Sequence, residues 1–221
     1  MKKAARILIY CIGMVALAVG ITLNTKTGLG VSPIISVAYS ISEIWGLNFG
    51  DMTFILYALF VAAQFALRCK ESRWYDLLQL VVSLIFSRLL NLFAACIPYD
   101  STGHALPANL ALLALAIVLT GVGVSMTVNM RLIPNPGDGI VQAIAERVGW
   151  EQGFAKNVFD LGCVSVTILI GLVFVHQVVG ISIGTLCAMV GVGRMVALTN
   201  HLFKAKMCAA AGLTETVEAK T

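Results

Sequence analysis

Charged residues are scarce in this chain. Only 12% of its 221 residues are Asp, Glu, Lys or Arg, whereas 59% are hydrophobic. A soluble domain usually carries about 25% charged residues, so the composition excludes an ordinary soluble protein. The basic residues lie in short tracts, with no basic face and no interleaved aromatic residues, and we therefore expect no nucleic-acid partner.

Two motifs of common chemistry are also missing. The chain contains no phosphate-binding G-x-x-x-x-G-K-[ST] pattern and no zinc-protease H-E-x-x-H pattern. Its six cysteines form neither a C-x-x-C pair nor a Cys/His cluster, so we expect no metal site and no cofactor. Because no nucleophile can be paired with a base, we expect no enzyme activity.

Long apolar runs, in contrast, are abundant. A helix needs about 20 apolar residues to cross a bilayer, some of which can come from flanking residues. Six runs approach this length, at residues 7–23, 54–67, 77–97, 110–128, 158–175 and 178–198. The first run is longer than the apolar core of a signal peptide and is expected to be a retained helix. The sequence thus predicts an all-α polytopic membrane protein with six spanning helices, whose partner is the lipid bilayer.

Two stretches of the chain resemble each other. Residues 32–50 (SPIISVAYSISEIWGLNFG) align with residues 135–153 (NPGDGIVQAIAERVGWEQG) at an offset of 103. Five of the nineteen aligned positions are identical, at Pro33/Pro136, Ile41/Ile144, Glu43/Glu146, Gly46/Gly149 and Gly50/Gly153. We therefore expect two structural repeats, residues 1–100 and 101–206, each with three spans and one short helix. A disordered tail is expected at residues 207–221.

Each aligned stretch begins with a predicted short helix, at residues 32–45 and 135–148. Ser32 and Asn135 are good N-caps, a proline follows each at the first helical position, and a glycine ends each helix. Both helices are short for a span. They could be re-entrant and enter the protein from opposite faces, lie on the two surfaces, or be short full spans.

The basic residues bear on this choice. Under the positive-inside rule, Lys2, Lys3 and Arg6 place the N-terminus in the cytoplasm, and Arg68 should also be cytoplasmic. Six spans with two re-entrant helices satisfy both conditions, make the second repeat inverted and place the C-terminus in the cytoplasm. Eight full spans would give a parallel repeat and would move Arg68 outside. Lys26 is the one basic loop residue that fits the re-entrant arrangement badly.

The motifs GLGVSP, NPGDGIVQAI and, at residues 180–186, GISIGTL resemble those of the YczE/YyaS/YitT group of bacterial integral membrane proteins, and the YczE branch most closely. In that branch the first short segment usually reads Gly-x-Gly-Pro-Trp-Asp and the second Gly-Pro-x-Asp-Gly. Here Asp138 keeps the second acid, whereas Ile34 and Ile35 replace the first Trp and Asp. The resemblance implies a bacterial inner-membrane protein and implies no particular substrate.

An inverted repeat would bring the starts of the two short helices together near the middle of the membrane. A helix N-terminus carries roughly half a positive charge, which Asp138 would partly neutralise. Asp138 either binds a cation or a coupling proton, or only caps its helix. The predicted site at the interface of the repeats consists of Ser32, Pro33, Asn135, Pro136 and Asp138, with Arg88 and Arg194 nearby.

Arg88 and Arg194 lie inside apolar runs at a repeat offset of 106. A charge within a membrane helix costs about 2.5–3.5 kcal/mol on insertion scales, so each should face protein or water. The pair either attracts an anionic group to the site or only ties helices together. Their candidate partners are Asp160, Asp76 and Glu43.

These observations predict a small bacterial inner-membrane transporter or permeation protein for a small solute or ion that the sequence does not identify. The alternative is a membrane scaffold or regulator of a partner complex that transports nothing. A homo-oligomer would suit so small a bundle, but no residue specifies one.

Overall fold

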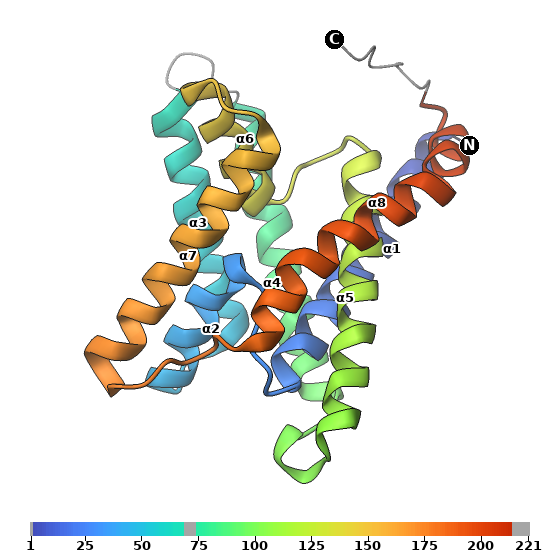
Figure 1. Cartoon of the computed structure of the whole chain (residues 1–221). Helices are drawn as coiled ribbons and strands as arrows, with labels where there is room; N and C mark the ends of the chain where they lie inside the picture. The colour runs from blue at the N-terminus through green and yellow to red at the C-terminus, as the bar shows by residue number, and fades with distance from the viewer. Residues whose placement is uncertain (1, 69–73, 214–221) are drawn as a thin grey trace.

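The computed structural model describes residues 2–68 and 74–213, and in this part of the chain all regular structure is helical (Figure 1). Six helices are long and apolar enough to cross a membrane. They are α1 (Lys2–Lys26), α3 (Phe49–Arg68), α4 (Leu78–Cys96), α5 (Leu106–Asn129), α7 (Gln152–Val175) and α8 (Ile183–Ala211). The short 3-10 helices η2 (Trp74–Leu77) and η3 (Ser101–Gly103) precede α4 and α5. The predicted all-α class with six candidate spans is confirmed.

The two predicted short helices are α2 (Pro33–Trp45) and α6 (Pro136–Val148), each of 13 residues. Both have a proline in the first turn and end at a glycine in the left-handed conformation, Gly46 with φ 63° and Gly149 with φ 76°. The Asn135 side chain accepts a hydrogen bond from the Gly137 amide, as an N-cap does, whereas Ser32 makes no such bond. Local capping residues therefore determine where both helices begin and end.

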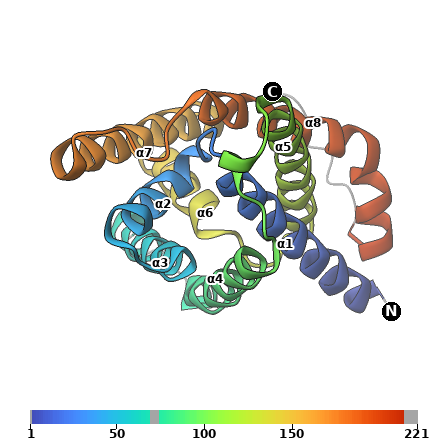
Figure 2. The same ribbon diagram turned by 90° about the horizontal axis from the view of Figure 1, so that it is seen from below.

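Helices α1 and α5 pack along each other. Helix α4 packs against α1, and α8 packs against α5. On the other side, α3 packs against α6 and α7 against α2 (Figure 2). The arrangement is uneven in one respect, because α3 also packs on α4, while α7 makes no comparable contact with α8 among the described residues.

Helix ends with many basic residues gather at one end of the molecule, here named the basic end. It contains the start of α1, the end of α8, and the connection from α6 to α7 (Figure 1). The connection from α4 to α5 lies at the opposite end. The segments at the basic end carry Lys2, Lys3, Arg6, Arg68, Arg131, Arg147, Lys156, Lys204 and Lys206.

The contact between α1 and α5 depends on close backbone approach at glycines. A Cβ added at Gly20 would lie 2.6 Å from the Thr120 amide nitrogen, and one added at Gly123 would lie 2.5 Å from the Leu17 amide nitrogen. Only glycine fits at these two positions, and small residues of this kind are typical of packed membrane helices.

The predicted start of the disordered tail was wrong. Helix α8 continues through Ala211, so residues 207–211 are helical, and Cys208 and Ala211 are buried. Met207 and Ala211 pack in a cluster with Tyr10 of α1, which holds the end of α8 against the first helix. Residues 214–221 of the predicted tail lie outside the described part of the chain.

Candidate functional site

The starts of the two short helices meet inside the protein. A Cβ added at Gly137 in α6 would lie 3.3 Å from the Ile34 Cγ2 atom in α2. Pro33 and Pro136 are buried, as expected for helix ends that face protein rather than solvent. The structure therefore brings the first turns of α2 and α6 together, and these turns carry or adjoin the predicted residues Ser32, Pro33, Asn135, Pro136 and Asp138.

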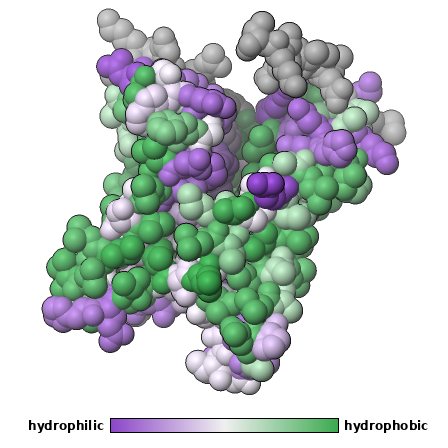
Figure 3. All heavy atoms as spheres, viewed as in Figure 1, coloured by the Kyte–Doolittle hydropathy of each residue, from purple (hydrophilic) through white to green (hydrophobic). Residues whose placement is uncertain are grey.

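A cavity of about 620 Å³ leads from the basic end to this meeting point. Its walls come from the end of α5, the connection to α6, the first half of α6 and the start of α7, and include Thr127, Arg131, Asn135, Asp138, Gln142 and Gln152. Figure 3 shows the molecule hollowed at this end, with hydrophilic surface on both sides of the hollow. Of the predicted residues, Asn135 and Asp138 line the cavity.

Among the described residues that line this cavity, Asp138 is the acidic one. It lies in the first turn of α6 and is only partly exposed. Within the described part of the chain its carboxylate has no hydrogen bond and no ion pair. The nearest basic residue of α7 along this face, Lys156, is bound to Asp160 at 3.2 Å. An acidic residue inside a membrane protein that lacks such a partner is a candidate functional group.

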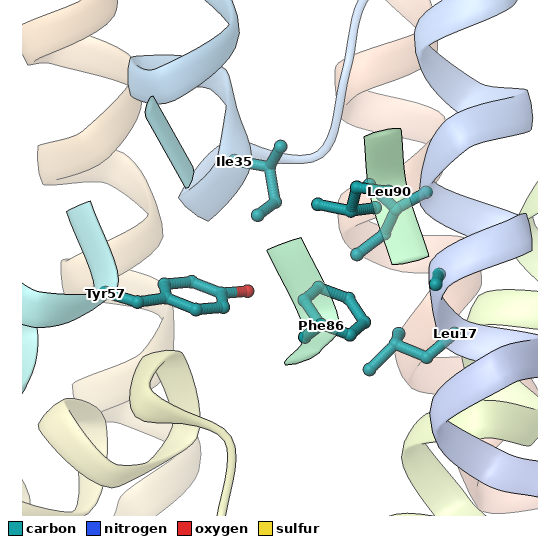
Figure 4. Packing of buried hydrophobic residues seen from close by; sticks show 7 residues of the cluster. Leu17, Ile35, Tyr57, Phe86 and Leu90 are labelled. Carbon is teal, nitrogen blue, oxygen red and sulfur yellow. The ribbon is translucent and has the colours of Figure 1, made fainter. Parts of the chain in front are cut away.

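Apolar side chains fill the protein beyond the cavity. Next to Asn135 is a void of only about 20 Å³, lined in part by Tyr10, Tyr57 and Phe86. Behind it lies a cluster, here named the central cluster, that consists of Leu17, Ala18, Ile21, Ile35, Tyr57, Phe86 and Leu90. In Figure 4 the Tyr57 hydroxyl points toward Phe86 and Ile35 at the middle of this cluster. The cavity therefore ends in the centre of the protein and does not form an open channel.

A pair of buried glutamines holds α6 in place. Gln64 of α3 and Gln79 of α4 exchange side-chain hydrogen bonds of 3.3 and 3.1 Å, and Gln64 also donates to the Pro136 carbonyl at 3.3 Å. A Cβ at Gly139 would lie 2.6 Å from the Gln64 Oε1 atom, so a larger residue there would displace the Gln64 amide from its hydrogen bonds. Both glutamines are almost fully buried.

We expect Gln64→Leu to destabilise the protein by about 1–3 kcal/mol, because it leaves the Gln79 amide buried without its partner. Gln64→Leu combined with Gln79→Leu should recover part of this loss, since no unpaired amide remains, but not the bond to Pro136. Unfolding midpoints of both single variants and the double variant in detergent measure the coupling. A double variant that loses the sum of the single effects would contradict the pairing.

The two predicted arginines do not belong to this site. The Arg88 Nη1 atom pairs with the Asp51 Oδ1 atom at 3.0 Å, and its side chain is 63% exposed. Arg194 is exposed on α8 and has no partner among the described residues. Arg88 thus fits the alternative in which an arginine only ties two helices together, here α3 and α4.

The partners suggested for the arginines were also wrong. Asp160 pairs with Lys156 one helical turn away, and Asp76 pairs with Arg68 at 3.5 Å. Glu43 is exposed at the opposite end of the protein. Asp51 was overlooked because it lies between apolar residues at the start of α3, and only the packing of α3 on α4 brings it to Arg88.

The sequence analysis also missed other residues of the site. Gln64 and Gln79 are polar residues within apolar runs, and this could have marked them, since polar groups inside membrane helices need partners. Tyr57 gave no such signal. Gln142 and Gln152 looked like ordinary surface residues of helices, and only the fold places them on the cavity wall.

One further sequence pattern has a structural explanation. Residues 180–184 read Gly-Ile-Ser-Ile-Gly, which matches the G-x-S-x-G spacing of a hydrolase nucleophile. That motif requires a turn from a strand into a helix, and the described residues contain no strand. Ser182 instead caps α8, and its amide donates to the Thr185 Oγ1 atom at 3.3 Å.

Comparisons with known proteins agree with the predicted resemblance. The uncharacterized membrane protein YczE of Bacillus subtilis (strain 168) is 28% identical over 153 residues, which cover 69% of this chain and 68% of that protein. No solved structure matches the chain significantly. A family model described as a family of unknown function, DUF6198, matches residues 4–201. Since this match covers nearly the whole chain, the protein belongs to the DUF6198 family.

Proposed function

We propose that this protein transports a small cation, or a solute coupled to a proton, across the bacterial inner membrane. The observation that carries the proposal is the cavity of about 620 Å³ that ends at the unpaired carboxylate of Asp138, where the two short helices meet. Transporter sites are commonly formed by broken or half-membrane helices at the interface of two repeats.

Contacts between equivalent residues support an internal twofold repeat. Ile34 and Gly137, which contact each other, are themselves equivalent at the offset of 103. Two copies of one position can touch only near a twofold axis. At the same offset Gly20 is equivalent to Gly123, and Leu17 is equivalent to Thr120. The contact of Gly20 with Thr120 therefore has its counterpart in the contact of Gly123 with Leu17.

A second correspondence involves the starts of the short helices. Ser36 in α2 shares a hydrogen bond of 2.7 Å with Thr167 of α7. Adding 103 to 36 gives Gly139 in α6, and subtracting 103 from 167 gives Gln64 in α3; these two residues are also in contact. Each repeat therefore uses a polar residue of its third helix to hold the short helix of the other repeat.

The charges favour a cation over an anion. Asp138 is the acidic residue on the described wall of the cavity, and it is only partly exposed. Arg131 lines the same cavity but is exposed. The arginines expected to attract an anion, Arg88 and Arg194, lie elsewhere. A bound cation or proton would neutralise Asp138 at a depth where a lone charge is costly.

We place the basic end in the cytoplasm and the short helices as half-membrane helices that enter from opposite faces. In a version without native cysteines, a membrane-impermeant thiol reagent added outside should modify Ser101→Cys but not Glu151→Cys. Permeabilised cells, in which both positions should react, provide the control. Eight full spans would put both positions on the cytoplasmic side, so protection of position 101 would overturn this topology.

The function is tested with purified protein in liposomes and a panel of inorganic and organic cations, neutral solutes and anions. We expect uptake of one or more cations, or a proton flux that accompanies uptake of a solute. Empty liposomes control for leakage. Uptake of anions alone would contradict the proposed charge of the site, and no uptake of any solute would favour the alternative of a membrane scaffold.

A further inference from the structure

We propose that a second cavity, at the end opposite the basic end, is the outer entrance of the same pathway and that the connection from α7 to α8 closes it. This inference rests on the proposed function and adds the gate. The second cavity has a volume of about 400 Å³ and a polar wall that includes Thr25, Tyr39, Glu43 and residues 178–182.

The two cavities occupy equivalent places in the two repeats. The outer cavity is lined by first-repeat residues 25, 28, 30, 31, 39 and 43. With 103 added, the first five become 128, 131, 133, 134 and 142, all of which line the inner cavity. Equivalent cavities at opposite ends are what alternating access in an inverted repeat requires.

Backbone hydrogen bonds close the outer cavity at its floor. The Val31 amide donates to the Gly180 carbonyl at 2.9 Å, and the Gly184 amide donates to the Leu29 carbonyl at 2.8 Å. Residues 178–185, here named the outer strap, therefore lie directly on the segment that precedes α2, and Figure 2 shows this crossing.

Glycines make the close approach feasible. Gly30 has a φ of +94°, and a Cβ there would lie 2.6 Å from the Thr185 Oγ1 atom. A Cβ at Gly184 would collide with the Leu29 carbonyl oxygen. A larger residue at position 184 must therefore push the outer strap away from residues 29–31.

At the basic end, residues 2–68 and 74–213 show no equivalent closure. Residues 132–134 correspond to 29–31, and residues 74–78 correspond to 180–184 at the offset of 106. No backbone hydrogen bond joins these two segments in the described part of the chain. The counterpart of Val31 is Pro134, which has no N–H to donate, so the sequence itself weakens the inner closure. In the described part of the chain the inner cavity is therefore open and the outer gate is shut.

The gate can be tested by thiol labelling, without knowledge of the solute. In a version without native cysteines, Ser32→Cys places a reporter just below the gate, and Tyr39→Cys places one in the outer cavity. With an impermeant reagent outside, we expect Tyr39→Cys to react and Ser32→Cys to be protected. Adding Gly184→Val should raise the labelling rate of Ser32→Cys roughly tenfold or more, because two backbone hydrogen bonds are lost.

Gly193→Val is the matched control, since it lies in the same helix and a Cβ there would meet no atom within 4 Å. It should leave the reporter protected. Equal labelling of Ser32→Cys with and without Gly184→Val would overturn the gate. Labelling is measured only on protein that elutes as a single species in detergent, so that misfolded protein does not contribute.

A second measurement covers the case in which Gly184→Val does not fold. A Cβ at Gly30, on the other side of the same contact, would lie 2.7 Å from the Ser182 amide nitrogen. Gly30→Ala should therefore also raise the labelling rate of Ser32→Cys from outside, while Asn135→Cys stays reactive from the basic end. Unchanged protection of Ser32→Cys in Gly30→Ala would overturn the gate. Labelling as expected, without uptake of any solute, would contradict the proposed function alone.

Discussion

Asp138→Asn is expected to abolish uptake, or to remove its dependence on pH, while the protein stays folded. The carboxylate ends the inner cavity and has no hydrogen-bonding or ionic partner among the described residues, so it supplies the negative charge of the proposed site. Asparagine has nearly the same shape and still suits the first turn of a helix, but it cannot hold a cation or take up a proton. Uptake into liposomes and the unfolding midpoint in detergent measure the two effects separately.

Asp51→Asn is the matched control for this experiment. It removes a carboxylate from another membrane helix, but that carboxylate pairs with Arg88 and does not line the cavity. Uptake should therefore persist in the control. If Asp138→Asn transports normally, Asp138 carries no coupling charge. If it fails to fold, the residue acts as a helix cap, as the alternative interpretation of the sequence holds.

Gly123→Val is expected to prevent folding or to lower the stability sharply. A Cβ at Gly123 would lie 2.5 Å from the Leu17 amide nitrogen and 2.7 Å from the Gly13 carbonyl oxygen. Both are backbone atoms of α1 and cannot rotate away, so α1 and α5 would have to separate. Overpacking typically costs about 1–3 kcal/mol, and this site should be at or above the upper limit. The yield of monodisperse protein and its unfolding midpoint measure the loss.

Gly162→Val controls for the lower helix propensity of valine. Gly162 lies within α7, and a Cβ there would meet no atom within 4 Å. This variant should purify like the natural protein. Equal midpoints for Gly123→Val and Gly162→Val would show that the contact between α1 and α5 is looser than the structure indicates.

The features that could be predicted from the sequence are those that depend on neighbouring residues. Apolar runs marked the six long helices, and the prolines and glycines at their ends marked α2 and α6. The contact between the first turns of α2 and α6 agrees with the alignment of the two stretches, in which Ile34 and Gly137 are equivalent at the offset of 103.

The features that could not be predicted depend on which helix faces which. The equivalence of Arg88 and Arg194 in the sequence did not show that both are exposed, since this is decided by the rotation of α4 and α8. Gln64 binds Pro136, which is 72 residues away, and no local pattern reveals that contact. The continuation of α8 depends likewise on the packing of Met207 and Ala211 against α1.

Ile35 in the central cluster has a consequence for energy coupling. It aligns with Asp138 at the offset of 103, so the described residues where α2 and α6 meet supply one carboxylate and not two. A single carboxylate balances a single positive charge, so under the proposed function the cation is monovalent and one elementary charge crosses the membrane with it. A charge that crosses the full membrane gains about 2.3 kcal/mol per 100 mV, equivalent to a roughly fiftyfold concentration ratio. Membrane voltage alone would therefore suffice to accumulate the cation, and transport should generate an electrical current.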